Sequence, residues 1–583
     1  MKVELRHQNQ IVTAATVMHD QMTSSQITQI DYLKELNFTI IPSIINDEVS
    51  LRGKIATDGV IFDTIISLPK QVPPSYPTFY LVDSGLELLE PHIERPYPYE
   101  LSKNTKKNIV CRTCIREEQN KSYSSNPVDL LHYLYKDFVE LCTKIARKEF
   151  DSKAEIFKEF DSYWPNTIEI YWDIQGIPMD ASLYEQVTVQ YKSEDNVKLY
   201  IVTDRPKNVI DFANKNGWNY KKEKSVYFDI ENEMPIPLPY TYGDLVKLLK
   251  QTDKFEQFKK LEKRITSQLF FIGFNLESGE KHFVGVWMNA IPVNGKIKKH
   301  SKVTGIMHSP LHKANHFLGG HVESIDYNRL MLRGGNKVNA ELSSKQKKIA
   351  IVGCGSVGST IAFKLSKSGI RNFVLIDPEK LKAANIGRHQ LGMSYVGDNK
   401  ALALSKHLES QFIGLNAIPS GNKVEFSDTI NLLQNVDLII TAIGSDAPAV
   451  EPWLADKVSK GLLPQILTCW LEADGISGHA LSIKKGDKLN FDQTCDTLNI
   501  LNREYAASLL ETEVGCNSTY MPYGFLDADI HINHIASFAL SLLKDTNKKA
   551  LSSFGNIDPY IKWLVKDVQA WTVMEYEYEA LSL

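Results

Sequence analysis

The chain has 583 residues, and at roughly 100 to 200 residues per domain this length indicates about three or four domains. Its 66 Lys and Arg against 70 Asp and Glu give a net charge of −4, which excludes the basic field of a nucleic-acid-binding protein and the acidic character of a disordered one. No run of about 18 apolar residues occurs, and the opening MKVELRHQNQ lacks the apolar stretch of a signal peptide. We therefore expect a soluble, cytoplasmic protein without a membrane or nucleic-acid partner.

Residues 1–160 have the pattern of a helix, several strands and a second helix. The segments FTIIPSII, VSLRGKIA and GVIFDTIISL predict strands separated by polar turns. The proline-rich KQVPPSYPTFYLV predicts an extended path into a further strand, and a long loop then leads to Cys111. The segment DLLHYLYKDFVELCTKIA has apolar residues at helical spacing. This order predicts an α+β domain.

Residues 161–320 predict a mixed α/β region that connects the two flanking domains or docks a partner. Strands such as IEIYWDI, LYIVTD and LFFIGFN alternate with helical segments such as YGDLVKLLKQ. We find no chemical motif there. The four histidines of HSPLHKANHFLGGH match no common zinc spacing and have no cysteine nearby, so a metal site is disfavoured.

Residues 321–583 predict a Rossmann-like domain with a nucleotide site. KKIAIVGCG, STIAFKLSKSG and NFVLIDPE form a strand, helix, strand unit, and VDLIITAIG and QILTCW extend it into a parallel sheet. Gly353, Gly355 and Gly358 fit the turn that lets a backbone approach phosphates at a helix N-terminus. Asp377, at the end of the next strand, can bind ribose hydroxyls. These features fit a nicotinamide dehydrogenase as well as an ATP-binding enzyme.

The residues after Asp377 favour ATP. Asn385, Arg388 and Lys400 follow just beyond the carboxyl edge of the sheet, where a triphosphate would lie and where a dehydrogenase needs no cations. Asp446 ends a later strand in TAIGSDAP, and its carboxylate suits Mg²⁺ held against phosphates. The sequence therefore predicts a site for ATP and Mg²⁺.

From about Asp326 to the C-terminus the sequence resembles the adenylating family of ubiquitin-activating and bacterial sulfur-carrier-activating enzymes. The glycine turn, Asp377, Asn385-x-x-Arg388, Val-Gly-x-x-Lys400 and Asp446 stand in the family's order. In that family an arginine upstream of the turn reaches the partner subunit's ATP, and this resemblance implies that role for Arg329, with Arg333 as the fallback, and a homodimer. It also implies attack of a carboxylate on the α-phosphorus, which expels pyrophosphate and leaves an acyl-adenylate.

Cys516 is the nucleophile candidate of this domain. Sulfur-carrier enzymes of the family often carry two zinc-binding Cys-x-x-Cys pairs, which are missing after the glycine turn, so the sequence favours the ubiquitin-type branch with a thioester cysteine. Cys516 follows ETEVG in a polar, glycine- and proline-containing segment that predicts an exposed loop. Cys469, in an apolar strand, and Cys354, inside the turn, are expected to be buried, and the acids around Cys495 disfavour its thiolate.

Residues 11–160 resemble a bacterial ubiquitin-conjugating enzyme fold in the order of their elements. This resemblance implies a thioester on Cys111, with Cys114 as the alternative, near basic residues that favour a thiolate. Half a zinc site and a redox pair remain competing explanations for Cys111 and Cys114. The family's His-Pro-Asn element is here only Pro91-His92-Ile93, which weakens an oxyanion role for His92.

The whole chain resembles the fusion enzymes of bacterial ubiquitin-like conjugation systems, especially those of CBASS antiphage operons. The resemblance implies that a partner's C-terminal glycine is adenylated with the help of Arg388 and Asp446, passed to Cys516 and then Cys111, and ligated to a target amine. The implied partner is a cGAS-like nucleotidyltransferase, or in a related reading a bacterial ubiquitin-like protein. Two alternatives of other classes are a non-catalytic nucleotide-binding scaffold and a nicotinamide oxidoreductase.

Overall fold

The computed structural model describes residues 22–41, 48–70, 75–82, 97–99, 108–113, 126–149, 160, 164, 168–174, 178–190, 198–230, 234, 242–262, 269–276, 281–287, 318–325, 330, 346–444, 446–488, 490–512, 519–544 and 548–577. The chain forms two compact units, residues 1–204 with 221–323 and residues 205–220 with 324–583. Within the described residues, no helix has the length and apolar character needed to cross a membrane.

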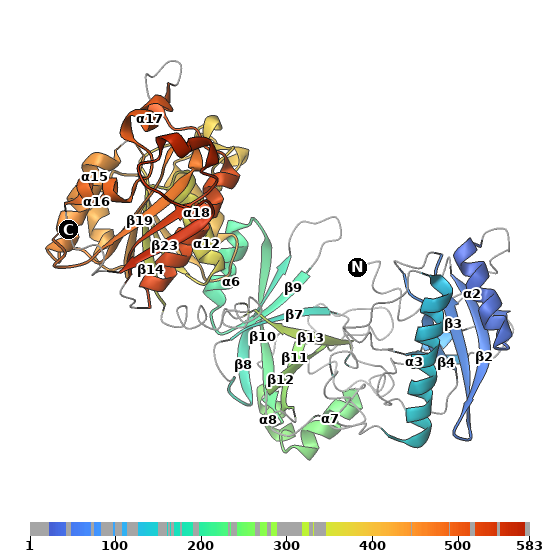
Figure 1. Ribbon diagram of the computed structural model, residues 1–583. Helices are drawn as coiled ribbons and strands as arrows, with labels where there is room; N and C mark the ends of the chain where they lie inside the picture. Colours follow the sequence, from blue (N-terminus) through green and yellow to red (C-terminus); the bar gives the residue numbers. More distant parts are fainter. Residues whose placement is uncertain are drawn as a thin grey trace. The chain divides into compact units, whose positions relative to one another are not determined.

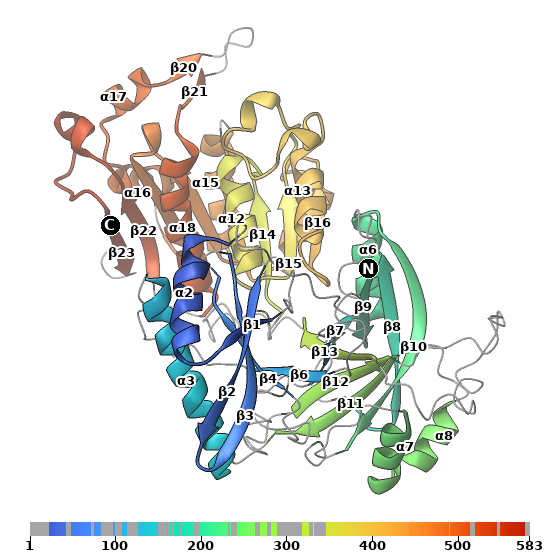
Figure 2. The same ribbon diagram turned by 90° about the vertical axis from the view of Figure 1, so that its right-hand side faces the viewer.

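The N-terminal part is an antiparallel sheet with two helices packed on it (Figure 2). The strands lie in the order β1-β2-β3-β4-β6-β5. The elements are α2 (Ser24–Glu35), α3 (Pro127–Arg147), β1 (Thr39–Ile41), β2 (Val49–Thr57), β3 (Val60–Leu68), β4 (Thr78–Val82), β5 (Tyr97–Tyr99) and β6 (Asn108–Arg112). The predicted order of helix, meander and helix is confirmed.

Local sequence sets the boundaries of these elements. Thr23 and Gln26 form a capping box at the start of α2, and the Asn126 side chain accepts from the N–H of Val128 at the start of α3. Asp58 and Gly59, with φ of 47° and 77°, form the two-residue turn of the β2–β3 hairpin. Both residues need positive φ in such a turn, because only then does its twist match that of the strands.

The middle strands close into a barrel, in the order β10-β11-β12-β13-β7-β9-β8. Four of its strands contribute to an aromatic cluster in which the Trp172 ring contacts the rings of Tyr227, Phe271 and Phe283. The strands are β7 (Ile168–Asp173), β8 (Ser182–Gln190), β9 (Lys198–Thr203), β10 (Asn219–Asp229), β11 (Leu269–Asn275), β12 (Lys281–Trp287) and β13 (Leu318–Ser324). Helices α7 (Tyr242–Gln251) and α8 (Phe255–Glu262) follow β10, and α6 (Pro206–Lys215) belongs to the second unit.

The C-terminal part contains an eight-stranded sheet in the order β16-β15-β14-β17-β18-β19-β22-β23. Figure 1 shows this part of the chain as strands with helices packed against them. The first five strands are parallel, and four of them, β14, β15, β17 and β18, were predicted, whereas β16 was not. The last three strands pair antiparallel, which was not predicted either. The strands are β14 (Lys348–Val352), β15 (Asn372–Ile376), β16 (Asn416–Ser420), β17 (Leu438–Thr441), β18 (Ile466–Leu471), β19 (Ser477–Ile483), β22 (Lys548–Phe554) and β23 (Thr572–Glu577).

Helices cover both faces of this sheet. Ile349 and Ile351 of β14 pack toward the helices of one face, and Ala350 and Val352 pack toward the other. This explains the uninterrupted apolar run of β14, because a strand buried on both faces has no polar side. The helices are α12 (Ser356–Lys367), α13 (Lys400–Glu409), α14 (Ser427–Ile430), α15 (Ala447–Ser459), α16 (Phe491–Leu498), α17 (Arg503–Ser508) and α18 (Phe525–Leu542).

Strand β14 lies at the point where the strand order reverses. Its neighbours are β15 on one side and β17 on the other, and all three run parallel. The loops that leave β14 and β17 diverge to opposite sides of the sheet, and such a switch point is where open α/β sheets bind ligands. The fold therefore places the glycine turn after β14 at the expected binding edge.

Candidate functional site

The glycine turn between β14 and α12 is built without room for side chains at two of its three glycines. Gly353 has φ of +92°, and a methyl group there would lie 2.4 Å from the carbonyl oxygen of Ala442, just after β17. A methyl group at Gly358 would lie 1.9 Å from the carbonyl oxygen of Gly353. At Gly355, the residue preceding α12, it would meet nothing within 4 Å. The turn is thus packed against β17 and open at the helix N-terminus, where backbone N–H groups can meet an anion.

Asp377, directly after β15, is tied to this turn. One of its carboxylate oxygens accepts from the N–H of Cys354 at 2.7 Å, and the other accepts from the N–H of Glu379 at 2.8 Å. Burial raises the pKa of Asp377, and Lys400 and the two backbone N–H groups oppose that rise. Each carboxylate oxygen has a second acceptor position, so Asp377 can both brace the turn and accept from a ribose hydroxyl.

Arg388 is fixed to the same turn through its backbone. The Ser356 hydroxyl, at the start of α12, donates to the carbonyl of Arg388 at 2.6 Å. The guanidinium lies 5.5 Å from the centre of the Tyr523 ring. Asn385 ends the short 3-10 helix η4 (Ala383–Asn385), where its side chain accepts from the N–H of Lys382. The cation Arg388 therefore lies beside the N-terminus of α12.

Lys400 is a buried cation at the start of α13. Its side chain is 8% exposed, and its ammonium lies 2.6 Å from the carboxylate of Glu379, which is 68% exposed. Asn399 caps α13 and also donates to the carbonyl of Asp377 at 2.8 Å. Because Glu379 can turn into water at little cost, the ammonium can exchange this carboxylate for a phosphate oxygen.

Asp446 lies on the other side of the turn, after β17. It occupies the position before α15, its side chain is 60% exposed, and it lies 3.8 Å from the ammonium of Lys423. No cluster of three or more metal-ligating side chains occurs among the described residues. A single exposed carboxylate nevertheless fits Mg²⁺, which usually keeps several waters and binds one or two carboxylates together with phosphates.

His389 is a buried part of this site that the sequence did not reveal. Its ring is held between two backbone groups: Nδ1 accepts from the N–H of Leu391 at 3.0 Å, so Nε2 carries the proton and donates to the carbonyl of Cys354 at 2.7 Å. Burial lowers the pKa of His389 to about 4. The neutral ring thus links the Arg388 segment to the glycine turn, a long-range contact that no local pattern indicates.

We expect the stability of the chain to fall between pH 6.5 and pH 4 because of His389. The unfolded chain takes up a proton below about pH 6.5, whereas the folded ring stays neutral until about pH 4, so folding is disfavoured by up to about 3 kcal/mol across this window. Urea unfolding of wild type and His389→Gln at pH 4 to 7.5 checks this. The variant should have a shallower pH dependence, and parallel curves would contradict the assignment.

The structure shows the burial of four of the seven cysteines. Cys354 and Cys469 are buried, as expected, and Cys142, in α3, is buried as well. Cys495 lies in α16, and burial, followed by Glu451 and Asp492, raises the pKa of its thiol to about 12, so the expected disfavoured thiolate is confirmed with burial as its main cause.

Several predicted residues are only partly placed or lie outside the described chain. Cys111, which was expected to follow a long loop, lies in β6 with its backbone paired to Leu81 of β4. Residues Cys114, Cys516, Arg329 and Arg333 fall outside the described residues. Cys516 lies in segment 513–518, which joins β20 (Glu511–Thr512) to its antiparallel partner β21 (Thr519–Tyr520).

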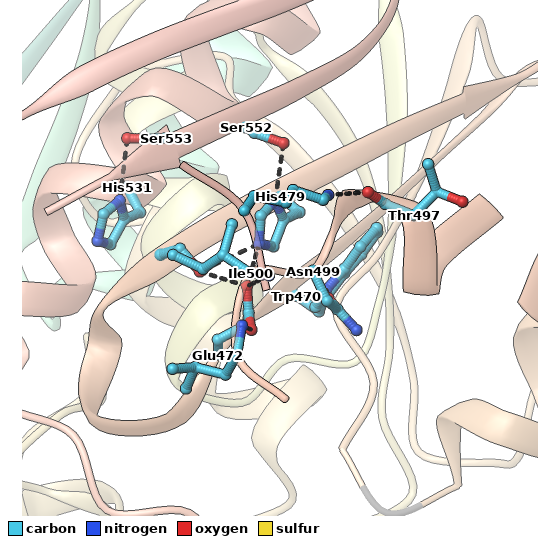
Figure 3. A network of polar contacts seen from close by, with 12 residues as sticks. Trp470, Glu472, His479, Thr497, Asn499, Ile500, His531, Ser552 and Ser553 are labelled. Carbon is cyan, nitrogen blue, oxygen red and sulfur yellow. Dashed lines mark hydrogen bonds and ion pairs between the residues drawn. The ribbon is translucent and has the colours of Figure 1, made fainter. Parts of the chain in front are cut away.

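A buried polar network centred on Glu472 supports the chain that leads to this hairpin (Figure 3). The Glu472 carboxylate accepts from the N–H groups of Ile500 and Leu501, each at 2.8 Å, and from Ser477 at 2.7 Å. His479 Nε2 lies 2.7 Å from the same carboxylate. No local pattern predicts this network, because the residues that bond Glu472 come from two other segments, β19 and residues 500–501.

Comparison with known proteins adds a family match to this geometry. Residues 327–497 match the ThiF family. The chain is 23% identical to the ATP-dependent ubiquitin transferase-like protein Cap2 of Escherichia coli (strain TW11681), over 72% of this chain and 73% of that protein. It is 31% identical to the Cap2 protein of Enterobacter hormaechei subsp. hoffmannii (strain UCI 50), over 24% of this chain but only 23% of that relative's length.

A crystal structure of Escherichia coli MccB with ATP aligns to 42% of this chain and 71% of that one, with 12% identity and a TM-score of 0.31. The family match spans the glycine turn, Asp377, Arg388, Lys400 and Asp446. Residues 327–497 of this chain therefore match the ThiF family, within a chain that is similar over most of its length to an ATP-dependent ubiquitin transferase-like protein.

Proposed function

We propose that the C-terminal domain adenylates the C-terminal glycine of a partner protein with ATP. The observation that supports this most is the open N-terminus of α12 at Gly355. Two cations lie close to it: Arg388, whose carbonyl accepts from Ser356, and Lys400, whose charge acts on Asp377, the residue that braces the turn. A carboxylate oxygen of the partner attacks the α-phosphorus, a new P–O bond forms, and the bond to the β-phosphate oxygen breaks. Pyrophosphate leaves with that electron pair, and Lys400 and Arg388 stabilise its charge.

Asp446 is the residue proposed to hold Mg²⁺ against the phosphates, where the ion would neutralise charge on the leaving pyrophosphate. Arg329, with Arg333 as the fallback, is proposed to reach the ATP of a second copy of the chain in a homodimer. Asp377 is proposed to bind the ribose and Asn385 to line the phosphate region. We assign these roles because the motifs of this chain stand in the same order as those of the adenylating family.

The activated acyl group is then proposed to pass to the thiol of Cys516. The thiolate attacks the acyl carbon, a C–S bond forms, and AMP leaves. Tyr523, whose ring faces Arg388, follows Cys516 by seven positions. An extended chain of this length spans at most roughly 25 Å, which supports a reach from the hairpin to the nucleotide site.

The N-terminal domain is proposed to have a ubiquitin-conjugating-like fold that receives the acyl group on Cys111, or on Cys114, and ligates it to a target amine. Its helix, antiparallel meander and second helix support this fold. Fusion of the two domains in one chain raises the effective concentration of one thiol near the other. The domain order that we propose is a ubiquitin-conjugating-like domain at residues 1–160, a connecting or partner-docking region at 161–320 and an adenylation domain at 321–583.

The proposed partner is a cGAS-like nucleotidyltransferase in antiviral defence, and the alternative is a bacterial ubiquitin-like protein. The names of the Cap2 relatives support a ubiquitin-like transfer but leave the partner open. A non-catalytic scaffold remains the rival of a different class. ATP–pyrophosphate exchange by the full chain with a candidate partner separates them, since a scaffold gives no exchange.

Substitution of the thiols tests the relay. Cys516→Ala should keep ATP–pyrophosphate exchange but lose the dithiothreitol-sensitive adduct with the partner on the activating domain, because only the acceptor thiol is removed. Cys495→Ala is the matched control, and it should keep both signals because that thiol is largely buried with a pKa of about 12. Mass spectrometry of the trapped adduct gives the site. A normal adduct on the activating domain of Cys516→Ala would refute this role.

A further inference from the structure

A cavity of about 520 Å³ opens at the N-terminal end of α18. Its wall includes Tyr523, the residue whose ring lies 5.5 Å from the Arg388 guanidinium. The cavity and the candidate nucleotide site therefore share a residue. A chain segment that occupies the cavity can continue from there toward the phosphate region.

The lining of this cavity is acidic and aromatic. Asp474 and Asp527 contribute two carboxylates, and Tyr523, Tyr560 and Trp571 contribute three aromatic side chains. None of the described lining residues is Lys or Arg. Carboxylates beside aromatic faces attract a cation and also cover its aliphatic stem.

His531 does not cancel this negative charge. Its Nε2 lies 2.8 Å from the carbonyl of Gly475, which can only accept, so Nε2 carries the proton and donates; its Nδ1 bonds Ser553 at 2.9 Å (Figure 3). Burial lowers the pKa of His531 from its ordinary value of 6.5. The ring is therefore neutral near pH 7, and the lining keeps two negative charges.

Asp474 is fixed in position before any ligand arrives. Its φ of 55° is in the left-handed region, which Asp tolerates better than most residues. Its N–H donates to the carbonyl of Pro522 at 3.2 Å, and its carboxylate accepts from the Tyr560 hydroxyl at 2.6 Å. A carboxylate can accept about four hydrogen bonds, so Asp474 retains capacity for a further donor.

An anionic ligand is the competing possibility, because the cavity lies at the start of α18 and a helix N-terminus attracts anions. Asp527 stands in the first turn of that helix. Its carboxylate supplies the negative charge that this position favours. The N-terminus of α18 is thus neutralised within the chain, and the net field in the cavity stays negative.

We propose that this cavity binds a Lys or Arg side chain located a few residues before the C-terminus of the protein that is adenylated. The proposal rests on the proposed function, since it names a feature of the substrate of that site. It makes Asp474 and Asp527 specificity-determining residues. A tail with a basic residue at the matching position is bound, and a tail with a neutral or acidic residue there is discriminated against.

Labelled pentapeptides with a free C-terminal glycine test the proposal on the full chain. Three registers carry Arg two, three or four positions before the C-terminus, and each has a matched peptide with Met instead. Fluorescence anisotropy measures binding, and ATP–pyrophosphate exchange with the unlabelled peptides measures activation. In at least one register, wild type should bind the Arg peptide at least about tenfold more tightly than the Met peptide, the effect expected of a charge-assisted contact.

The variants Asp474→Asn and Asp527→Asn should each reduce that preference by about tenfold. Asn tolerates the left-handed backbone of Asp474. Asp567→Asn removes an exposed charge outside the lining and should leave the preference unchanged. Equal binding of Arg and Met peptides, no binding of either, or a preference that survives both substitutions would overturn the proposal.

The two readouts separate this proposal from the proposed function. Arg-selective binding without any pyrophosphate exchange would preserve the cation pocket and refute adenylation. Exchange that is equally supported by Arg and Met peptides would preserve adenylation and refute the pocket.

Discussion

Gly358→Ala is expected to abolish ATP–pyrophosphate exchange and to destabilise the chain by about 2 to 4 kcal/mol. The added methyl group would lie 1.9 Å from the carbonyl oxygen of Gly353 and 3.2 Å from the Ile351 side chain. The first of these contacts is with backbone, which no rotamer change can relieve. The turn must therefore open or α12 must shift, and either change moves the N–H groups that are proposed to face the phosphates of ATP.

Gly355→Ala is the matched variant, because the same methyl group there meets nothing within 4 Å and Gly355 has φ of −74°. We expect its urea unfolding to resemble that of wild type. If the open side of the turn receives phosphates, this variant should still weaken ATP binding, because its methyl group occupies the space that a phosphate needs. Urea unfolding and ATP titration of both variants separate folding from binding.

Two outcomes would contradict this account. Normal exchange by Gly358→Ala would mean that the turn is not required for the reaction. Unchanged ATP affinity of Gly355→Ala would mean that the phosphates approach elsewhere, and the role of the α12 N-terminus would have to be abandoned.

The sequence predicted the glycine turn and the parallel strands because their determinants are local. A buried strand, three glycines and a helix occupy the consecutive positions 348–367, and each constrains its neighbours. The relation of Asp377 to the turn was also predictable, since a carboxylate after β15 must lie at the same edge of the sheet. Lys400 and Asp446 followed from the same rule.

The sequence did not predict features that depend on distant segments. His389 bonds Cys354, which lies 35 positions earlier, and His531 bonds Gly475, which lies 56 positions earlier. The middle strands close into a barrel because β10 pairs with β11 on one side and with β8 on the other. Strand propensity does not encode which strands pair. Pairing partners are a property of the folded chain, so periodicity alone leaves them undetermined.

Glu472→Gln is expected to loosen the segment that leads to the β20–β21 hairpin. One carboxylate oxygen of Glu472 accepts from Ile500 and the other from Leu501, so the amide nitrogen of Gln must face one of these two N–H donors. A buried donor without an acceptor and the loss of the charged partner of His479 together cost about 3 kcal/mol. Hydrogen exchange of the peptide that covers residues 499–512 should be faster in the variant.

The pH dependence of this effect has a definite sign. Burial on its own would raise the pKa of Glu472, but the hydrogen bond and charge of His479, with the other donors, outweigh it and lower the pKa. The stabilisation is therefore present above the ordinary Glu pKa of about 4.3 and is lost as the pH falls through the lower value in the folded chain. The difference in stability between wild type and Glu472→Gln should shrink in acid.

Glu504→Gln is the control for this variant, since Glu504 is exposed and lies in α17, within the same segment. It should leave exchange of residues 499–512 near the wild-type rate. If Glu472→Gln keeps wild-type protection at Ile500 and Leu501, the network does not anchor the hairpin. Another outcome is that protection falls while ATP–pyrophosphate exchange is retained and the thiol adduct is lost. In that case Glu472 acts by positioning the β20–β21 hairpin, whose strands are joined by residues 513–518, and the nucleotide site folds independently of the Glu472 network.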